Sequence, residues 1–424
     1  MLSKLKRSEF TKNVVTLTSG TAIAQAIPVL LSPILSRIFS PEDFGILALF
    51  MSVAAVLSVI ATGRYELAIM IPENKKDAYN VLALSLIITF ITAIIALVLV
   101  ILFRKPAIIF FEEPAIGPWL FLIPVVVLFA GIFQSFNYWS TRQKTFKLNA
   151  ASRVSQSTAN VTISLGLGFV KTGPAGLIAG YIVGQIVAGL ILFINFFNNI
   201  KEFLNLISVK GIKTNAKKYR NFLMINTPHA FVDSLQDNGI VYLIMYFFSK
   251  HVLGSYSFAF RVLKAPVSLI GGALFQVFYQ EASVAASKGE NLRPKIMKIY
   301  KTLFFTGFPV FLILFLFTPD IFAFVFGENY RESGEIARII TPWLFLNFLA
   351  SPVSCVTLVM NKQKVAFYFT ITDISFKVLA ITIGGLTNDF HLAFIIMSSL
   401  CSLLLIFALF WYYRISKPIK SELY

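Results

Sequence analysis

Long apolar stretches recur along the whole chain, and they constrain its fold more than any other feature. Lipid offers no hydrogen-bond partner to exposed backbone groups, so a chain crosses the hydrocarbon layer as helices of about 20 apolar residues. Twelve such windows can be marked in the 424 residues. They lie near 13–38, 44–70, 78–103, 118–138, 154–170, 174–197, 223–248, 254–280, 302–318, 336–360, 366–385 and 391–413. The pattern predicts an all-α membrane protein with twelve transmembrane helices.

Composition excludes several classes of protein. The chain is 57% hydrophobic and 13% charged, whereas soluble domains are about 45–50% apolar and about 25% charged. Cys355 and Cys401 each lie inside an apolar run, which argues against a disulfide framework or a cysteine zinc site. The three histidines are far apart and form no HExxH motif. We therefore expect no metal site and no cofactor. The chain is also expected not to be an enzyme, because its largest outer segment holds no convincing nucleophile and base.

The distribution of Lys and Arg predicts the orientation in the membrane, because cytoplasmic loops retain positive charge. With the N-terminus inside, the inner segments hold 26 of these residues and the outer segments hold 7. Both termini are therefore expected in the cytoplasm. The formal net charge of +17 is then loop charge beside anionic lipid head groups, and it does not require a nucleic-acid partner.

A short pattern, F-S-x4-G, occurs at 39–45 and again at 248–254. Each copy joins the first two predicted spans of one half of the chain, which indicates a duplicated six-helix unit. We expect an N-terminal lobe at 1–200, a basic cytoplasmic linker at 201–222 and a C-terminal lobe at 223–424, related by a pseudo-two-fold axis along the membrane normal. Six basic residues and several apolar ones in the linker indicate an interfacial helix.

Ionisable residues inside the spans are the main functional candidates, because they are costly at membrane depth. In the seventh span, His229, Asp233 and Asp237 follow an i, i+4, i+8 spacing and share one helical face. Two carboxylates one turn apart raise each other's proton affinity, so one of them could exchange protons. The alternative is a polar seam that neighbouring helices satisfy.

The second half also holds basic residues near the middle of its spans. Arg261 and Lys264 are three residues apart in the eighth span, with no acidic neighbour in that helix segment. In the eleventh span, Asp373 and Lys377 are spaced i, i+4 with the acid first, an order that favours an internal ion pair. A cationic binding surface and a structural ion pair both remain open for this second pair.

The first half contributes fewer charges. Arg64 and Glu66 lie toward the cytoplasmic end of the second span, where snorkelling to the interface also explains the arginine. Arg153 begins a polar stripe on the fifth span, which could line a cavity or hold helices together. Cationic side chains facing a polar space would suit an anionic or polyhydroxylated cargo, since Arg binds phosphate oxygens bidentately.

Three segments resemble one known family. They are residues 35–45 (LSRIFSPEDFG), 63–68 (GRYELA) and 326–330 (FGENY). They are similar to the polysaccharide repeat-unit flippases, the Wzx-like O-antigen translocases of the multidrug/oligosaccharidyl-lipid/polysaccharide exporter superfamily. The resemblance covers essentially the whole chain, because the six-plus-six topology and the inside termini also fit.

The resemblance implies two six-helix lobes around a central cavity. It also implies transport of an undecaprenyl-diphosphate-linked oligosaccharide, for O-antigen or a related lipopolysaccharide, from the cytoplasmic to the periplasmic leaflet of a bacterial inner membrane. Membrane lipids, a polysaccharide polymerase and a chain-length regulator would be the other partners. The substrate-binding candidates are Arg64, Arg153, Arg261, Lys264 and Lys377; the ion-coupling candidates are Glu66, Asp233, Asp237 and Asp373; and Arg37, near the outer end of the first span, is a candidate gate residue.

Two other functions remain open at this point. A drug or cation antiporter of the same superfamily would share the architecture, and Asp233 and Asp237 favour it because cationic substrates need carboxylates. A membrane glycan polymerase or ligase would need catalytic residues in a large outer loop. The largest outer segment, 319–335, holds no convincing nucleophile and base.

Overall fold

The computed structural model describes residue 16, residues 19–360 and residues 362–417, with the exception of the side chains at positions 237, 276, 287 and 363. The start of the first predicted span and the side chain of Asp237 therefore lie outside this description. All the regular elements among the described residues are helices. The chain divides into two compact units, Met1–Tyr242 and Leu243–Tyr424.

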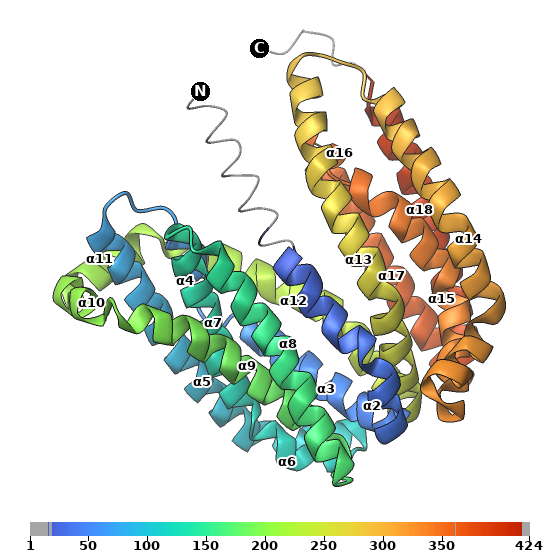
Figure 1. Ribbon diagram of the computed structural model, residues 1–424, viewed down its shortest axis with the longest axis horizontal. Helices are drawn as coiled ribbons and strands as arrows, with labels where there is room; N and C mark the ends of the chain where they lie inside the picture. The colour runs from blue at the N-terminus through green and yellow to red at the C-terminus, as the bar shows by residue number, and fades with distance from the viewer. Residues whose placement is uncertain (1–15, 17–18, 361, 418–424) are drawn as a thin grey trace. The chain divides into compact units, whose positions relative to one another are not determined.

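The helices of each unit are coloured along the chain in Figure 1. Unit 1 contains α2 (Ser32–Ile38), α3 (Pro41–Ser58), α4 (Tyr65–Ala68), α5 (Lys75–Phe111), α6 (Gly117–Leu120), α7 (Ile123–Arg142), α8 (Phe146–Phe169), α9 (Pro174–Phe197), α10 (Ile200–Leu206), α11 (Val209–Lys218) and most of α12 (Thr227–Phe247). Unit 2 contains α13 (Lys250–Ser287), α14 (Arg293–Phe326), α15 (Arg331–Ala350), α16 (Val356–Val359), α17 (Gln363–Leu386) and α18 (Phe390–Ile415).

Ten helices among the described residues are long and apolar enough to cross a membrane. The two other predicted spans coincide with α8 and α12. Polar residues interrupt the apolar sequence of α8, and the apolar part of α12 is only Asn238–Phe247. The all-α, multi-pass membrane architecture is confirmed, with ten candidate spans where the sequence predicts twelve.

Several helices are longer than their apolar windows. Helix α5 has 37 residues, α13 has 38 and α14 has 34, and at about 1.5 Å per residue each is roughly 50 Å or more in length. The hydrocarbon core is only about 30 Å thick. These helices therefore extend beyond the apolar segment that hydropathy detects.

The repeated F-S-x4-G pattern marks the start of a helix in both units. The Ser40 side chain accepts a hydrogen bond from the backbone N–H of Asp43, whose carboxylate accepts one from the backbone N–H of Ser40, and Pro41 occupies the first turn. In unit 2, the Ser249 side chain accepts from the backbone N–H of Val252. Such caps satisfy N–H groups that a helix start leaves unpaired.

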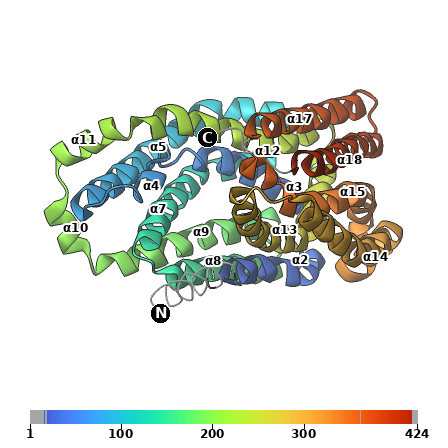
Figure 2. The ribbon, with the colours of Figure 1, turned by 90° about the horizontal axis from the view of Figure 1, so that it is seen from above.

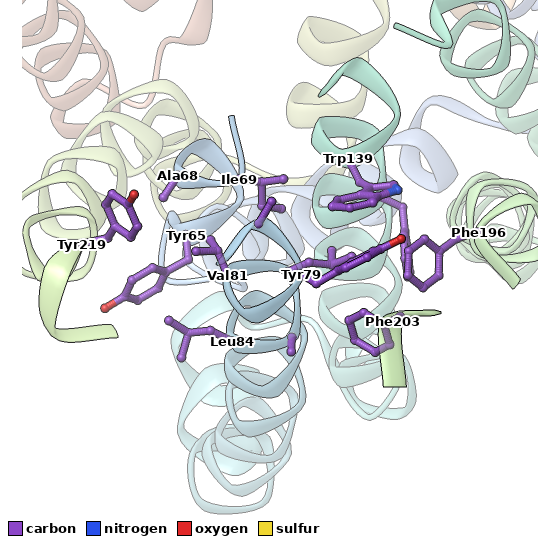
Figure 3. Close-up of a cluster of buried hydrophobic side chains, with 14 of the residues drawn as sticks. Tyr65, Ala68, Ile69, Tyr79, Val81, Leu84, Trp139, Phe196, Phe203 and Tyr219 are labelled. Carbon is purple, nitrogen blue, oxygen red and sulfur yellow. The ribbon is translucent and has the colours of Figure 1, made fainter. Parts of the chain in front are cut away.

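Aromatic side chains from helices α4, α5, α7, α9 and α10 form a core in unit 1 (Figure 3). The ring of Tyr79 on α5 stacks on Trp139 of α7, with centroids 4.5 Å apart, and meets Phe203 of α10 edge-on at 5.6 Å. Asn215 of α11 donates to Asp77 Oδ1 at 3.1 Å. The segment predicted as a linker forms two short helices, α10 and α11, which both pack against α5 within unit 1. Its role as an interfacial linker between two lobes stays a prediction.

Helix α15 is the packing centre of unit 2, where it contacts α13, α14 and α18. Helices α17 and α18 lie side by side, as both views show (Figures 1 and 2). This arrangement brings residues from α13, α15 and α17, far apart in sequence, into one neighbourhood.

Candidate functional site

Arg64 lies in a connection whose backbone conformation is unusual. Helix α3 ends at Ser58, and Gly63 and Arg64 then take positive φ angles of 58° and 60°. Glycine adopts this region freely, whereas a residue with a Cβ pays about 1–2 kcal/mol. Strained residues cluster at functional sites, but four other described non-glycine residues also have positive φ, so the contacts of the Arg64 side chain decide its role.

A buried carboxylate holds one end of the Arg64 guanidinium. Arg64 Nη1 lies 3.5 Å from Glu66 Oε1, and the exposed fractions of the two side chains are 28% and 1%. Thr62 donates a short hydrogen bond to the other oxygen of Glu66. Arg64 Nε is buried and has no hydrogen-bond partner among the described residues. The guanidinium is therefore anchored at one end and keeps an unused donor.

The Arg64 side chain lines an open pocket of about 420 Å³ in unit 1. Ser58 of α3, Gln134 of α7 and Asp233 of α12 also line this pocket. Gln134 donates to the backbone carbonyl of Ser58 at 3.3 Å, and its own carbonyl oxygen is buried without a partner among the described residues. The pocket thus combines a cation, a carboxylate and an amide. Two of its lining residues, Arg64 and Asp233, are site candidates that the sequence analysis assigns to different lobes.

Asp233 pairs within its own helix. Its Oδ2 lies 2.9 Å from His229 Nδ1, one turn earlier, and the exposed fractions of the Asp233 and His229 side chains are 54% and 70%. The predicted shared face is therefore present for these two residues. The expected repulsion between Asp233 and Asp237 stays a prediction, because the Asp237 side chain is outside the described part of the chain.

Arg153 on α8 belongs to the same neighbourhood. Tyr138 on α7 lies near the charged groups of Arg153, Arg64 and Glu66. The Arg153 guanidinium also lies over the ring of Phe133, 5.5 Å from its centroid, and its Nε is buried without a partner among the described residues. We call this group, with Asp233 and Gln134, the Arg64 cluster.

A second group of basic residues lies in unit 2. Lys264 on α13 donates from Nζ to Asn347 Oδ1 of α15 at 3.2 Å and lies 5.7 Å from the ring centroid of Phe260. The Phe260 ring in turn stacks on Trp343 of α15, with centroids 5.9 Å apart. Trp343 is buried, so these rings form a fixed aromatic wall.

Lys377 on α17 approaches the same wall. Its Nζ lies 5.1 Å from the Trp343 ring centroid and 2.5 Å from Asp373 Oδ2. The Lys377 and Asp373 side chains are 25% and 29% exposed. The i, i+4 ion pair predicted as an alternative is therefore present, and the lysine also meets an aromatic face. We call Lys264, Lys377, Phe260 and Trp343 the lysine cluster.

The two remaining candidates, Arg261 and Arg37, belong to neither cluster as defined above. Arg261 is partly buried one turn before Lys264 on α13. Arg37 is exposed in the last turn of α2, where a positive charge interacts favourably with the helix dipole. Arg37 is not among the residues that line the Arg64 pocket.

Several neutral residues of these clusters escape prediction from the sequence. Gln134, Tyr138, Asn347 and Trp343 are single polar or aromatic residues in apolar helices, and such residues are common. The spacing of Phe260 and Lys264, four residues apart on one helical face, is a signal that could have been used. Among the described residues, no group of three or more His, Cys, Asp or Glu side chains could hold a metal ion.

Solved structures with similar folds are transporters. An inward-facing multidrug resistance MATE family transporter of the MOP superfamily matches with a TM-score of 0.66 at 15% identity, covering 94% of each chain. The lipid II flippase MurJ, in an inward closed conformation, matches with a TM-score of 0.67 at 15% identity, covering 95% of this chain and 87% of MurJ. A MOP superfamily transporter from Pyrococcus furiosus, described as having a binding pocket of reverse polarity, matches with a TM-score of 0.57 at 16% identity, covering 96% of each chain.

These identities establish the fold alone, which is that of MOP-superfamily transporters. A search of curated proteins finds no match. A family model described as "Polysaccharide biosynthesis protein" matches residues 34–335, well over half of the chain. The resemblance seen in the sequence is confirmed, and the chain belongs to this polysaccharide biosynthesis protein family.

Proposed function

We propose that the protein is a flippase for lipid-linked oligosaccharides. It would move an undecaprenyl-diphosphate-linked repeat unit from the cytoplasmic to the periplasmic leaflet of a bacterial inner membrane by alternating access. Family membership supports a role in polysaccharide biosynthesis. The fold shared with a lipid II flippase makes a lipid-linked substrate plausible in chemical terms.

One observation carries the choice of an anionic cargo. Lys264 and Lys377 are 113 residues apart in the sequence, yet they converge on the same aromatic pair. Ammonium groups held in a partly buried setting suit a diphosphate, since hydrogen bonds between charged groups are about twice as strong as neutral ones. In this proposal Arg261, one turn before Lys264 on α13, assists the two lysines. Arg64 and Arg153 are the substrate-binding candidates of unit 1.

Export of surface glycan tests this assignment. A bacterial strain that lacks its own flippase would be complemented with the wild type, Lys264→Gln, Lys377→Gln or the double variant. We expect each single change to reduce export about tenfold or more, because one charged hydrogen bond contributes roughly 1.5–3 kcal/mol. Lys105→Gln, at an exposed position of α5, is the matched control and should export normally. Wild-type export by the double variant, at equal protein level, would refute the binding role.

Proton coupling is assigned to the carboxylates, with Asp233 first because its side chain reaches the Arg64 pocket beside His229. Glu66, Asp237 and Asp373 are the other candidates. In vesicles, lipid-linked oligosaccharide should move faster with a pH gradient than without one, and Asp233→Asn should remove that difference. Equal rates with and without the gradient would eliminate the coupling role.

The exposed carboxylate of Asp233 also suits a cationic drug, as in an antiporter of the same superfamily. Drug-resistance assays distinguish the two functions. Resistance that depends on Asp233, together with failure to complement glycan export, would favour the antiporter. Export without any change in resistance would favour the flippase.

A further inference from the structure

Unit 2 contains a groove that neither basic cluster uses. It lies between α14, α15 and α18 and has a volume of about 370 Å³. Phe315, Arg338 and Ile395 line it, together with a row of serines from α18: Ser398, Ser399 and Ser402. The groove therefore combines one cation, several hydroxyl groups and apolar walls.

The groove is separate from the lysine cluster. Arg338 and Asn347 both lie on α15, nine residues apart. At about 100° per residue this separation amounts to two and a half turns, so the two side chains leave opposite faces of the helix. Asn347 faces Lys264, which places Arg338 on the far side of α15 from the proposed diphosphate site.

Within the described part of the chain, Arg338 has no counter-ion, whereas its charged neighbours on α15 do. Arg331, two turns earlier on the same helix, pairs with Asp320 at 2.8 Å and Glu328 at 2.5 Å. Glu335, one turn before Arg338, pairs with His391 of α18 at 3.1 Å. Arg338 is exposed and makes no hydrogen bond or ion pair with any residue that the structure describes. An arginine on a spanning helix is costly in hydrocarbon unless it is paired or faces water or the head-group region, so an anion bound from outside would stabilise Arg338.

The walls indicate what kind of molecule brings that anion. Phe315 and Ile395 are 43% and 49% exposed on helices long enough to span a membrane, so an apolar chain could cover them. Ser402 Oγ is buried and has no hydrogen-bond partner among the described residues. A guanidinium binds phosphate oxygens in a bidentate manner, and serine hydroxyls can supply further hydrogen bonds.

We propose that this groove binds a membrane phospholipid. The phosphate lies on Arg338, the α18 serines donate to its head group, and one acyl chain covers Phe315 and Ile395. The lipid is a resident ligand of unit 2 and is not transported, so this site is independent of the proposed flippase function.

Native mass spectrometry of the purified full-length protein, titrated with phosphatidylglycerol, tests the site. The wild type should retain one tightly bound lipid, and Arg338→Gln should weaken its binding about tenfold. Arg331→Gln is the matched control, because it removes the same charge from the same helix at an arginine whose partners are protein carboxylates. Ile395→Trp, which fills the groove without changing charge, should also weaken binding.

Size-exclusion profiles and melting temperatures identify any variant that fails to fold. If Arg338→Gln does not fold, the lipid affinity of Ile395→Trp tests the site instead. Wild-type affinity in either folded variant would overturn the proposal. Displacement of phosphatidylglycerol by an equimolar amount of undecaprenyl phosphate would also overturn it, because the groove would then be a site for the transported lipid class.

Discussion

The two units fix their basic residues by different means. In unit 1, Arg64 sits on a left-handed backbone between two helices and pairs with a fully buried carboxylate. In unit 2, Lys264 and Lys377 sit on regular helices, lie beside aromatic rings and have partners that are only partly buried. The position of the Arg64 side chain thus depends on one buried ion pair and on local backbone geometry, whereas the positions of Lys264 and Lys377 depend on helix packing.

Removing the carboxylate from each cluster should produce the largest difference in stability between the two units. Glu66→Ala deprives both Thr62 and Arg64 of a buried partner, so we expect a loss of about 2–3 kcal/mol in unfolding free energy. Asp373→Ala removes a partly exposed partner and should cost less than about 1 kcal/mol. Thermal unfolding in one detergent would measure both. Equal losses would show that the two ion pairs are equivalent.

Replacing Arg64 and Lys264 by Gly or Ala should show how the backbone conformation differs at the two positions. At position 64 the Gly variant should be more stable than the Ala variant by about 1 kcal/mol, because alanine is strained at positive φ. At position 264, inside α13, the order should reverse by about 1 kcal/mol, because glycine is a poor helix former. Melting temperatures of the four variants suffice. The same order at both positions would contradict the left-handed conformation of Arg64.

The smallest effect is expected outside both clusters. Lys75 donates to Glu202 at 2.7 Å, and this hydrogen bond lowers the pKa of the Glu202 carboxyl below its usual value of 4.5. A lowered folded-state pKa contributes stability that is present above the unfolded value and is lost as the pH falls through the folded value. The wild type should therefore lose stability as the pH falls below about 4.5, and Lys75→Met should lose less over the same range. Melting temperatures of both proteins across an acidic pH series would show the difference. An unchanged acid profile would mean that the pair contributes nothing measurable.

The sequence predicts much of the fold and part of each cluster. Apolar windows predict where helices lie, because a backbone inside lipid must satisfy its hydrogen bonds within a helix. The F-S-x4-G repeat predicts the connection between the first two spans of each half, and the structure adds that Ser40 and Ser249 cap the helices that follow. The i, i+4 spacing predicts the His229–Asp233 and Asp373–Lys377 pairs. Spacing reveals such contacts because both partners lie on one helix.

Contacts between different helices could not be predicted from the sequence. Gln134 and Asn347 look like ordinary polar residues until α7 and α15 are placed, and only then do they meet Ser58 and Lys264. Arg64 and Asp233 are 169 residues apart, and no local pattern predicts that they line the same pocket.

From the sequence alone it follows that the chain forms apolar helices, roughly where most of them lie, and which ionisable residues must be accommodated inside them. These properties follow from hydropathy and helical periodicity, which are local. Which charges gain a partner and which face an open pocket became known only from the helix packing, as did the lack of a counter-ion for Arg338 among the described residues. Those outcomes depend on the packing of helices from distant parts of the chain, and the same residues in another packing would have other partners.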